Sequence, residues 1–351
     1  MEGRAKEWWQ SGSHFEWTPP PEQPSQSSDP IRIFHAELGD PDSPLVVLLH
    51  GFPTSSIDWS DVAPLLADRF RLGMLDFPGF GFSEKPKRGP YTIRRDAALV
   101  AHYVGEVLGA VSSAVVAHDR GDSVALALVE LAGRAASGFE LTSLVLSNGN
   151  VFLPLSNLTT FQRLLLDPAT APSVLEVLTP EMLAAGMGTT TFTPPRTMDN
   201  PSIAALAETF AFDDGLAVLH DTIQYLVERS ENEAKWLELL AGSPVPTTVV
   251  WGLHDTVAPL RVATHVWDRY LSSKPGDNTF WLLPRANHYL QNDQPAELAE
   301  VIRSAMAASG GDSPAPAGPG ALSAAEGAPV LLDRSRAVMP SAAEVLRSPA
   351  G

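Results

Sequence analysis

The chain contains no cysteine among its 351 residues. Disulfide bonds, thiolate metal sites and cysteine nucleophiles are therefore excluded, and the composition fits a reducing compartment. No apolar run approaches the roughly 18 residues of a membrane-spanning helix, and Met1 to Gln10 has no apolar core of signal-peptide length. From these absences we expect a cytoplasmic protein without a membrane span.

Positive charge is also scarce, with 24 Lys and Arg against 41 Asp and Glu and a formal net charge of −17. A polyanion would be repelled and no basic cluster offsets the repulsion, so we expect no nucleic-acid partner. Hydrophobic residues make up 44% of the chain, which is typical of a globular protein. The length suffices for one large domain or for a core with an inserted cap. The sequence does not indicate an oligomeric state.

Short apolar runs alternate with helical patterns along most of the chain. Brief, branched runs predict buried strands, and apolar residues at every third or fourth position predict helices. The predicted strands are 13–17, 31–35, 45–49, 71–76, 114–117, 141–146, 247–251 and 279–283. The predicted helices among them are 54–68, 93–110, 124–136, 260–271 and 295–308. This alternation is typical of an α/β fold with a mostly parallel, eight-stranded sheet covered on both faces.

The alternation stops between residues 151 and 240, where helix-like segments are broken by prolines. An insertion at this place would lie over the carboxyl edge of the sheet, where open α/β sheets bind ligands. We therefore predict a core made of residues 1–150 and 241–308, with a helical cap formed by residues 151–240. Residues 309–351 are rich in Gly, Ala, Pro and Ser, which predicts a disordered tail.

Asp119 stands at the junction between the predicted strand 114–117 and the helix that follows. Ala117 and Gly121 lie two residues before and two residues after it, and a sharp strand-to-helix turn needs small residues at both places. This spacing is that of a nucleophile elbow, with Asp where lipases have Ser. An Asp that caps the following helix is the alternative interpretation.

Two further candidate residues follow the last two predicted strands. Asp255 lies beyond strand 247–251, and His288 lies beyond strand 279–283. Because the carboxyl ends of parallel strands meet at one edge, both should arrive beside Asp119, in the chain order nucleophile, acid and histidine. Taken singly, Asp255 could cap a helix and His288 could be a solvated loop residue. Three placements on one edge favour a catalytic triad.

The residues around these positions form longer motifs, namely His50 to Ile57, Leu75 to Ser83, His118 to Asp122, Leu146 to Gly149 and Gln224-Tyr225. Through them the chain, from about residue 8 to 305, resembles the α/β-hydrolase superfamily in its branch of epoxide hydrolases and dehalogenases with an Asp nucleophile. Within that branch it is most similar to the mesoderm-specific transcript family of epoxide-hydrolase-like proteins. The resemblance implies an α/β-hydrolase fold without cofactor or metal. It also implies an oxyanion hole formed by the backbone N–H groups of Phe52 and Arg120.

An aspartate nucleophile suits attack on saturated carbon, because the carboxylate is ionised at neutral pH without help from a base. The product would be an alkyl ester of Asp119. A water molecule deprotonated by His288 would hydrolyse this ester, while Asp255 holds the imidazole in place. The expected partner is a small apolar or amphipathic substrate with an electrophilic carbon.

The leaving group separates the candidate reactions. An epoxide oxygen needs a proton donor, which epoxide hydrolases provide with two cap tyrosines; residues 151–240 contain only Tyr225, which could equally well be packing in its helix. Haloalkane dehalogenases usually have Trp directly after the nucleophile, where this chain has Arg120, and Trp236 lies near the far end of the cap. Fluoroacetate dehalogenases carry a second Arg where this chain has Ser123. Epoxide hydrolysis therefore lacks the fewest parts.

Three other interpretations are weaker. A serine esterase would need Ser at the elbow tip, and Ser123 lies too far into the helix. A phosphate-binding loop at Phe77 to Ser83 lacks the Lys-Ser/Thr that should follow. A non-catalytic binding protein on the same fold need not retain nucleophile, acid and base together. We predict an epoxide-hydrolase-like hydrolase, with a haloalkane or haloacetate dehalogenase as the alternative.

Overall fold

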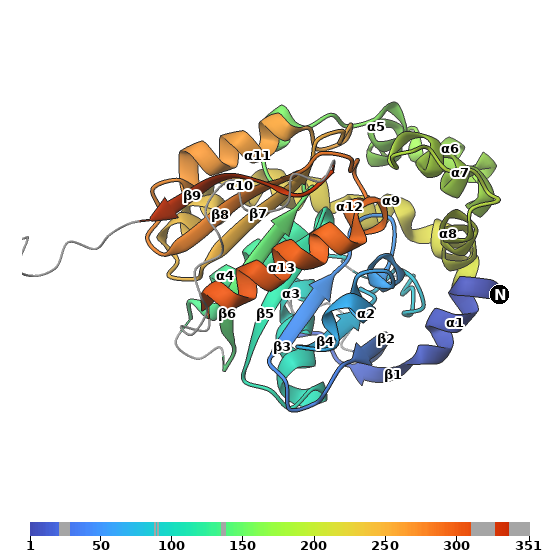
Figure 1. Ribbon diagram of the computed structural model, residues 1–351. Helices are drawn as coiled ribbons and strands as arrows, with labels where there is room; N and C mark the ends of the chain where they lie inside the picture. Colours follow the sequence, from blue (N-terminus) through green and yellow to red (C-terminus); the bar gives the residue numbers. More distant parts are fainter. Residues whose placement is uncertain (21–28, 88, 90, 135–137, 310–326, 337–351) are drawn as a thin grey trace, which may run out of the picture.

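The computed structural model describes residues 1–20, 29–87, 89, 91–134, 138–309 and 327–336. Their centre is a nine-stranded sheet in the order β1-β2-β4-β3-β5-β6-β7-β8-β9 (Figure 1). The strands are β1 (Gly12–Trp17), β2 (Ile31–Leu38), β3 (Leu45–Leu49), β4 (Arg71–Leu75), β5 (Ser112–His118), β6 (Glu140–Ser147), β7 (Thr247–Gly252), β8 (Asp277–Leu283) and β9 (Val330–Arg336). Strands β3 to β8 are mutually parallel, whereas β1, β2 and β9 pair in antiparallel fashion. The predicted mostly parallel α/β sheet is confirmed.

The central strands are buried on both faces. Val47 of β3 lies in register with Val115 of β5, and neither side chain is exposed to solvent. A parallel strand covered on both faces has no solvent side for polar residues, so its sequence loses the polar alternation of a half-buried strand. This explains why 45–49 is an uninterrupted apolar run.

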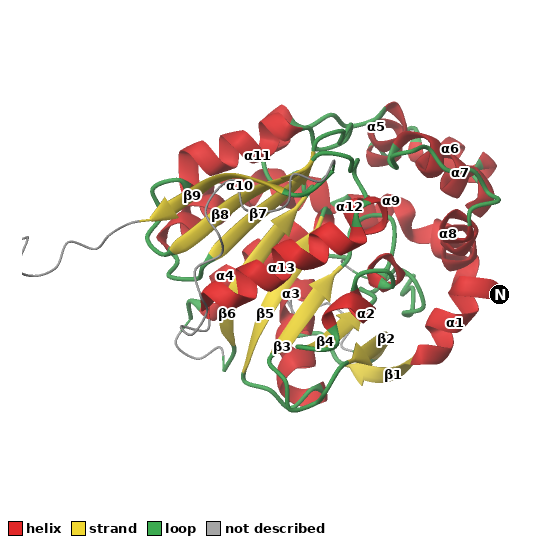
Figure 2. Ribbon diagram, in the orientation of Figure 1, coloured by secondary structure: helices red, strands yellow, loops and turns green. Residues whose placement is uncertain are grey.

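Helices cover both faces of the sheet (Figure 2). On one face α3 (Ile93–His102), α4 (Arg120–Ala132) and α10 (Tyr225–Gly242) pack together, and on the other face α2 (Ala63–Leu66) packs against α13 (Pro295–Ser309). The helix predicted over 54–68 is interrupted: a 3-10 turn at Ser56–Trp59 is followed by the new helix α2, which has Pro64 in its first turn. The helices predicted over 93–110 and 260–271 are α3 and α11 (Leu260–Val266), each followed by one π-helical segment, at Tyr103–Val107 and Trp267–Leu271.

The segment between β6 and β7 is helical. It contains α5 (Thr160–Leu166), α6 (Ala171–Val177), α7 (Pro180–Thr190), α8 (Pro201–Ala211) and α9 (Leu219–Ile223), with 3-10 turns at Leu153–Leu155 and Phe212–Val218, and it ends with α10. In Figure 1, α5 to α9 lie beyond the carboxyl ends of the parallel strands, whereas α10 returns to α4. These helices are the ones that we propose as the cap. No helix in the described ranges is long and apolar enough to cross a membrane.

An N-terminal helix, α1 (Gly3–Ser11), was not among the predicted elements. The Trp8 indole donates a hydrogen bond to Ser56 Oγ at 3.1 Å. The Arg4 guanidinium pairs with Asp61 at 2.8 Å and donates to Ser202 Oγ at 3.2 Å. Because Ser56 and Asp61 belong to the core and Ser202 to α8, helix α1 connects the core with the proposed cap.

Residues 330–336 correct the prediction of a disordered tail over 309–351. They form β9, which adds a ninth strand beside β8. Trp267 Nε1 donates to Asp333 Oδ2 and Asn278 Nδ2 donates to Ser335 Oγ, both at 2.8 Å. The open edge of β8 supplies the backbone partners that the composition of the tail cannot supply by itself. The rest of the predicted tail, except residues 309 and 327–329, lies outside the described residues.

Candidate active site

Asp119 lies at the tip of a tight turn between β5 and α4. Its backbone has φ 53° and ψ −112°, a strained conformation for a residue other than glycine. Glycines allow the turn to approach β3 closely. A Cβ on Gly51 would lie 2.6 Å from Asp119 Cβ, and a Cβ on Gly121 would lie 2.8 Å from the Leu49 carbonyl oxygen. The turn therefore presents the Asp119 carboxylate at the carboxyl edge of the sheet.

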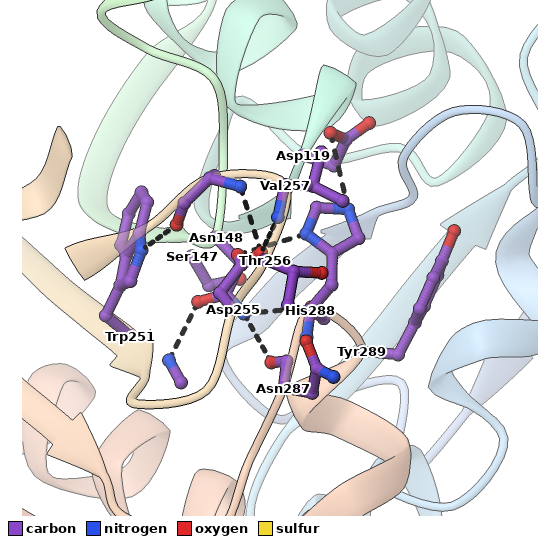
Figure 3. A network of polar contacts seen from close by, with 12 residues as sticks. Asp119, Ser147, Asn148, Trp251, Asp255, Thr256, Val257, Asn287, His288 and Tyr289 are labelled. Carbon is purple, nitrogen blue, oxygen red and sulfur yellow. Dashed lines mark hydrogen bonds and ion pairs between the residues drawn. The ribbon is translucent and has the colours of Figure 1, made fainter. Parts of the chain in front are cut away.

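His288 lies between two carboxylates (Figure 3). Its Nδ1 is 3.0 Å from Asp255 Oδ2, and its Nε2 is 3.6 Å from Asp119 Oδ2. The other oxygen of Asp255 accepts hydrogen bonds from the N–H groups of Val257 and Ala258, which fixes the carboxylate toward the imidazole. All three side chains are buried. The three residues that the sequence placed on separate loops thus form one chain of contacts.

The charges of Asp119, His288 and Asp255 depend on one another. Burial lowers the pKa of His288, but Asp255 and Asp119 outweigh burial and raise the pKa of His288 to about 10. Burial likewise opposes ionisation of Asp119, yet the hydrogen bond and charge of His288 hold the pKa of Asp119 below its usual value. At neutral pH the site therefore holds an Asp119 carboxylate against a His288 imidazolium.

The two residues predicted for an oxyanion hole lie on either side of Asp119. The Phe52 N–H donates to Asp119 Oδ1 at 2.8 Å. Arg120 is the first residue of α4, where backbone N–H groups have no acceptor within the helix. Both backbones are therefore adjacent to the Asp119 side chain.

The Arg120 side chain does not reach the substrate side of the site. It is fully buried and pairs with Asp96 of α3. Its guanidinium carbon also lies 5.2 Å, 5.1 Å and 5.6 Å from the ring centres of Phe77, Phe80 and Tyr225. This charge is therefore neutralised and enclosed by α3, α10 and the loop after β4.

Tyr225, the predicted cap proton donor, begins α10 and is also buried. Its ring centre lies 6.0 Å from that of Phe52. Burial and the charge of Asp119 raise the pKa of the Tyr225 hydroxyl, and its interaction with the Asn150 side chain opposes this rise. The Tyr225 ring thus lies on the side of the site where Arg120 is enclosed.

A cavity of about 350 Å³ opens onto His288, which is the size of a small-molecule site. The core and the loops at the sheet edge contribute Phe52, Pro53, Thr256, Val257, His288 and Tyr289, and the proposed cap contributes Thr159, Phe161, Gln162, Leu178, Met182, Leu183, Gly186, Met187, Thr190 and Thr191. Among these described residues none is Lys or Arg, and neither Arg120 nor Tyr225 belongs to the lining. Tyr289, which the sequence analysis did not single out, lines the cavity next to His288.

Two side chains that the sequence analysis also missed hold the His288 loop. Asn148 Nδ2 donates to the carbonyls of Asn287 and His288 at 2.7 Å and 2.9 Å, and its Oδ1 accepts from the Gly252 N–H at 2.9 Å. Burial lowers the pKa of His118 to about 3, so its neutral ring donates from Nε2 to the His288 carbonyl at 2.8 Å. The signal for Asn148 was its position directly after β6, at the same sheet edge as the triad.

Comparisons with known proteins agree with this architecture. Residues 46–301 match the family model described as the alpha/beta hydrolase family. A Mycobacterium tuberculosis protein that carries the name hydrolase LipZ is 34% identical over 271 residues, which are 76% of this chain and 90% of that protein. The mesoderm-specific transcript protein of Mus musculus is 32% identical over 276 residues, 76% of this chain and 80% of that protein.

Among solved structures, the haloalkane dehalogenase DbeA from Bradyrhizobium elkani superposes with a TM-score of 0.65. The likeness covers 83% of this chain and 96% of that one, at 20% sequence identity. At this level of identity the likeness shows the fold alone.

Proposed function

The chain belongs to the alpha/beta hydrolase family, and on that premise we propose that it hydrolyses epoxides through a covalent ester on Asp119. The observation that carries the proposal is the contact chain from Asp119 through His288 to Asp255, beside the Phe52 N–H and at the end of an apolar cavity. The predicted resemblance to the mesoderm-specific transcript family is confirmed. A carboxylate at the elbow tip suits attack on saturated carbon.

In the first step the Asp119 carboxylate attacks one carbon of the epoxide. A carbon–oxygen bond to Asp119 forms, the ring carbon–oxygen bond breaks, and the released oxygen takes up a proton. The low pKa of Asp119 keeps the nucleophile ionised for this attack.

The second step uses the change in charge that the first step causes. Ester formation removes the Asp119 charge, one of the two negative charges that raise the pKa of His288. The imidazolium then releases its proton more readily, and the neutral ring can accept a proton from a water molecule that attacks the ester carbonyl. The N–H groups of Phe52 and Arg120 would stabilise the resulting oxyanion, and loss of one such donor typically costs about 3 kcal/mol.

The dehalogenase alternatives find less support among the same residues. A haloacetate needs a guanidinium for its carboxylate, and the Arg120 side chain pairs with Asp96 outside the cavity lining. A halide needs N–H donors, and Trp236 Nε1 instead donates to Glu130 Oε2 of α4 at 2.9 Å. The apolar lining matches a small apolar or amphipathic epoxide.

The proposal is tested by trapping the ester. A His288→Gln protein mixed with styrene oxide should gain the full mass of the substrate, with the added mass on the peptide that contains Asp119. The matched control is the His288→Gln, Asp119→Asn double variant, which should gain none. If the single variant gains no mass with styrene oxide or any other epoxide in a panel, the proposed function is wrong.

The leaving group is tested in the wild-type protein. Styrene oxide should yield its diol, and 1-bromobutane should release bromide at least about tenfold more slowly. If bromide is released from 1-bromobutane but no diol forms from styrene oxide, the protein is a dehalogenase and not an epoxide hydrolase.

A further inference from the structure

Opening an epoxide creates an alkoxide, which must receive a proton from a nearby acid. Hydroxyl groups in the cavity lining belong to Thr159, Thr190, Thr191, Thr256 and Tyr289. The hydroxyls of Thr190, Thr191 and Thr256 donate to backbone carbonyls at 2.8 to 3.2 Å, and Thr159 lies on the exposed surface. Tyr289 is the lining residue with a phenol, whose ordinary pKa near 10 makes it the strongest acid of this set.

The Tyr289 ring is held beside the catalytic histidine candidate. Its centre lies 5.2 Å from that of His288 with the two planes perpendicular, and it stacks on Phe192 at 4.9 Å. In Figure 3 the hydroxyl points in the same direction as the His288 ring, toward the end of the site that holds Asp119. The ring is therefore fixed with its hydroxyl directed toward that end of the site.

In the described part of the chain, the acceptor nearest to the Tyr289 hydroxyl is a weak one. Its closest recorded acceptor is the Phe52 carbonyl oxygen at 3.5 Å, well beyond the usual 2.7 to 2.8 Å for a hydroxyl donor. Phe52 is also the residue whose N–H contacts Asp119 Oδ1. The Tyr289 hydroxyl thus contacts the carbonyl of Phe52, while Asp119 contacts the N–H of the same residue. Because the hydroxyl's own acceptor is weak, a stronger acceptor in the cavity can take its proton.

A carboxyl group lies behind the phenol. The Thr54 side chain interacts with the Tyr289 hydroxyl and donates its own hydroxyl to Asp58 Oδ2. Burial raises the pKa of Asp58 to about 8, so at neutral pH this group is mainly protonated and adds little negative charge beside the phenol.

Tyr225 has a different position. Its ring packs against the Arg120 guanidinium and Phe52, and it is not part of the cavity lining. Tyr289 is therefore the phenol that lines the cavity itself, whereas Tyr225, like Asp119, lies outside the lining.

We propose that Tyr289 is the acid that protonates the epoxide oxygen when Asp119 attacks, an inference that rests on the proposed function. As the carbon–oxygen bond of the ring breaks, its electron pair stays on oxygen and takes the phenol proton, which leaves a tyrosinate and an alcohol. The His288 imidazolium then gives its proton to the tyrosinate, which restores the phenol and leaves a neutral ring. In the second step this ring takes one proton from the attacking water and becomes an imidazolium again, so one epoxide and one water become one diol.

The test compares Tyr289→Phe with Tyr225→Phe in single-turnover reactions with styrene oxide, quenched and read by intact mass. Tyr289→Phe should form the Asp119 ester about 100-fold more slowly than wild type, and should hydrolyse the ester, once formed, within twofold of the wild-type rate. Tyr225→Phe should change both rates less than threefold. If Tyr289 had only a structural role, Tyr289→Phe would displace His288 as well and would slow both steps together.

A second measurement does not depend on the variant folding. In heavy water, ester formation by the wild-type protein and by Tyr225→Phe should slow about twofold or more, because a proton moves in that step. The inference is overturned if a folded Tyr289→Phe forms the ester within threefold of wild type, or if wild type shows no solvent isotope effect. In either case the ester still forms on Asp119, whereas absence of any ester in the trapping experiment would overturn the proposed function itself.

Discussion

The two sides of Asp119 differ in how their polar groups are arranged. On the cavity side, mostly apolar side chains surround His288, Tyr289 and the Phe52 N–H. On the other, which we call the helix side, the buried ionisable side chains of Arg120, Arg229, Asp96 and Asp122 lie among α3, α4 and α10. Both guanidinium groups near the nucleophile are therefore enclosed by helices, so they are a poor guide to the polarity of its substrate.

The two guanidinium groups of the helix side are themselves unlike. Arg120 pairs with Asp96. Arg229 instead donates to the Val151 carbonyl, and in both arginines Nε and Nη1 have no hydrogen-bond partner in the part of the chain that the structure describes. Burial lowers the pKa of Arg229 to about 10. One charge is thus part of an ion pair that holds α3 to the elbow, and the other is not.

The largest effect should follow from a change on the cavity side. We expect Asp119→Ala to reduce diol formation from styrene oxide by roughly 10⁵-fold or more, because it removes the atom that forms the ester. The matched control is Ser123→Ala, one turn into α4 on the helix side, which should retain activity within threefold. Steady-state rates measure both, and a loss of comparable size in Ser123→Ala would point to a serine nucleophile.

The next largest effect should separate the two arginines. Arg120→Met removes the partner of a buried carboxylate and should lower the free energy of unfolding by about 3 to 5 kcal/mol. Arg229→Met removes a guanidinium that has no ion pair among the described residues. It should change the free energy of unfolding by less than about 1 kcal/mol, in either direction. Urea unfolding measures both variants, and equal losses would contradict the difference between the two groups.

The pH dependence of stability should sharpen the comparison further. The pKa of His288 is about 10 in the folded protein and about 6.5 when unfolded, so the folded state binds this proton more tightly. The resulting stabilisation is complete below about pH 6.5 and is lost as the pH rises toward 10, by at most about 1.4 kcal/mol per pH unit.

The measurement is the free energy of unfolding of wild type and His288→Gln at several pH values between 7 and 10. The advantage of wild type over the variant should shrink as the pH rises, while the groups common to both proteins cancel. If the free energies of unfolding of wild type and His288→Gln change with pH in parallel, the carboxylates of Asp119 and Asp255 do not stabilise the imidazolium.

The smallest effect should come from the cap wall of the cavity. Met182 lines the cavity and remains 56% exposed, so Met182→Ser should raise KM for a long-chain alkyl epoxide about threefold to fivefold, through loss of apolar contact worth roughly 1 kcal/mol. Val177→Ser is the matched control, because Val177 is exposed but lies outside the lining. Equal changes in KM would contradict substrate contact with this wall.

The sequence places Asp119, Asp255 and His288 on one edge because each follows a recognisable strand, and parallel strands bring their carboxyl ends together. The fold itself could be predicted for the same reason, since buried strands are short apolar runs. These inferences need only local patterns and the topology of the sheet.

Other features depend on contacts that no local pattern contains. β9 pairs with β8, whereas the composition of its own segment predicts disorder. The partner of the Arg120 side chain lies on α3, 24 residues earlier in the chain, and becomes visible only when the two helices pack. Whether Tyr289 faces the cavity or the core depends on the course of the loop after β8, although its position next to His288 is plain in the sequence.

Helix α1 has a consequence for how the cavity can open. A cap attached to the core only through the chain segments after β6 and before β7 could rotate as a rigid body about those two connections. The contacts of Arg4 with Asp61 and with Ser202 add a third point of attachment, remote from the other two along the chain. The ion pair of Arg196, between α7 and α8, with Asp293 at 3.1 Å adds another attachment. Attachments at separated points oppose that rotation, so we expect α8 to move together with the core.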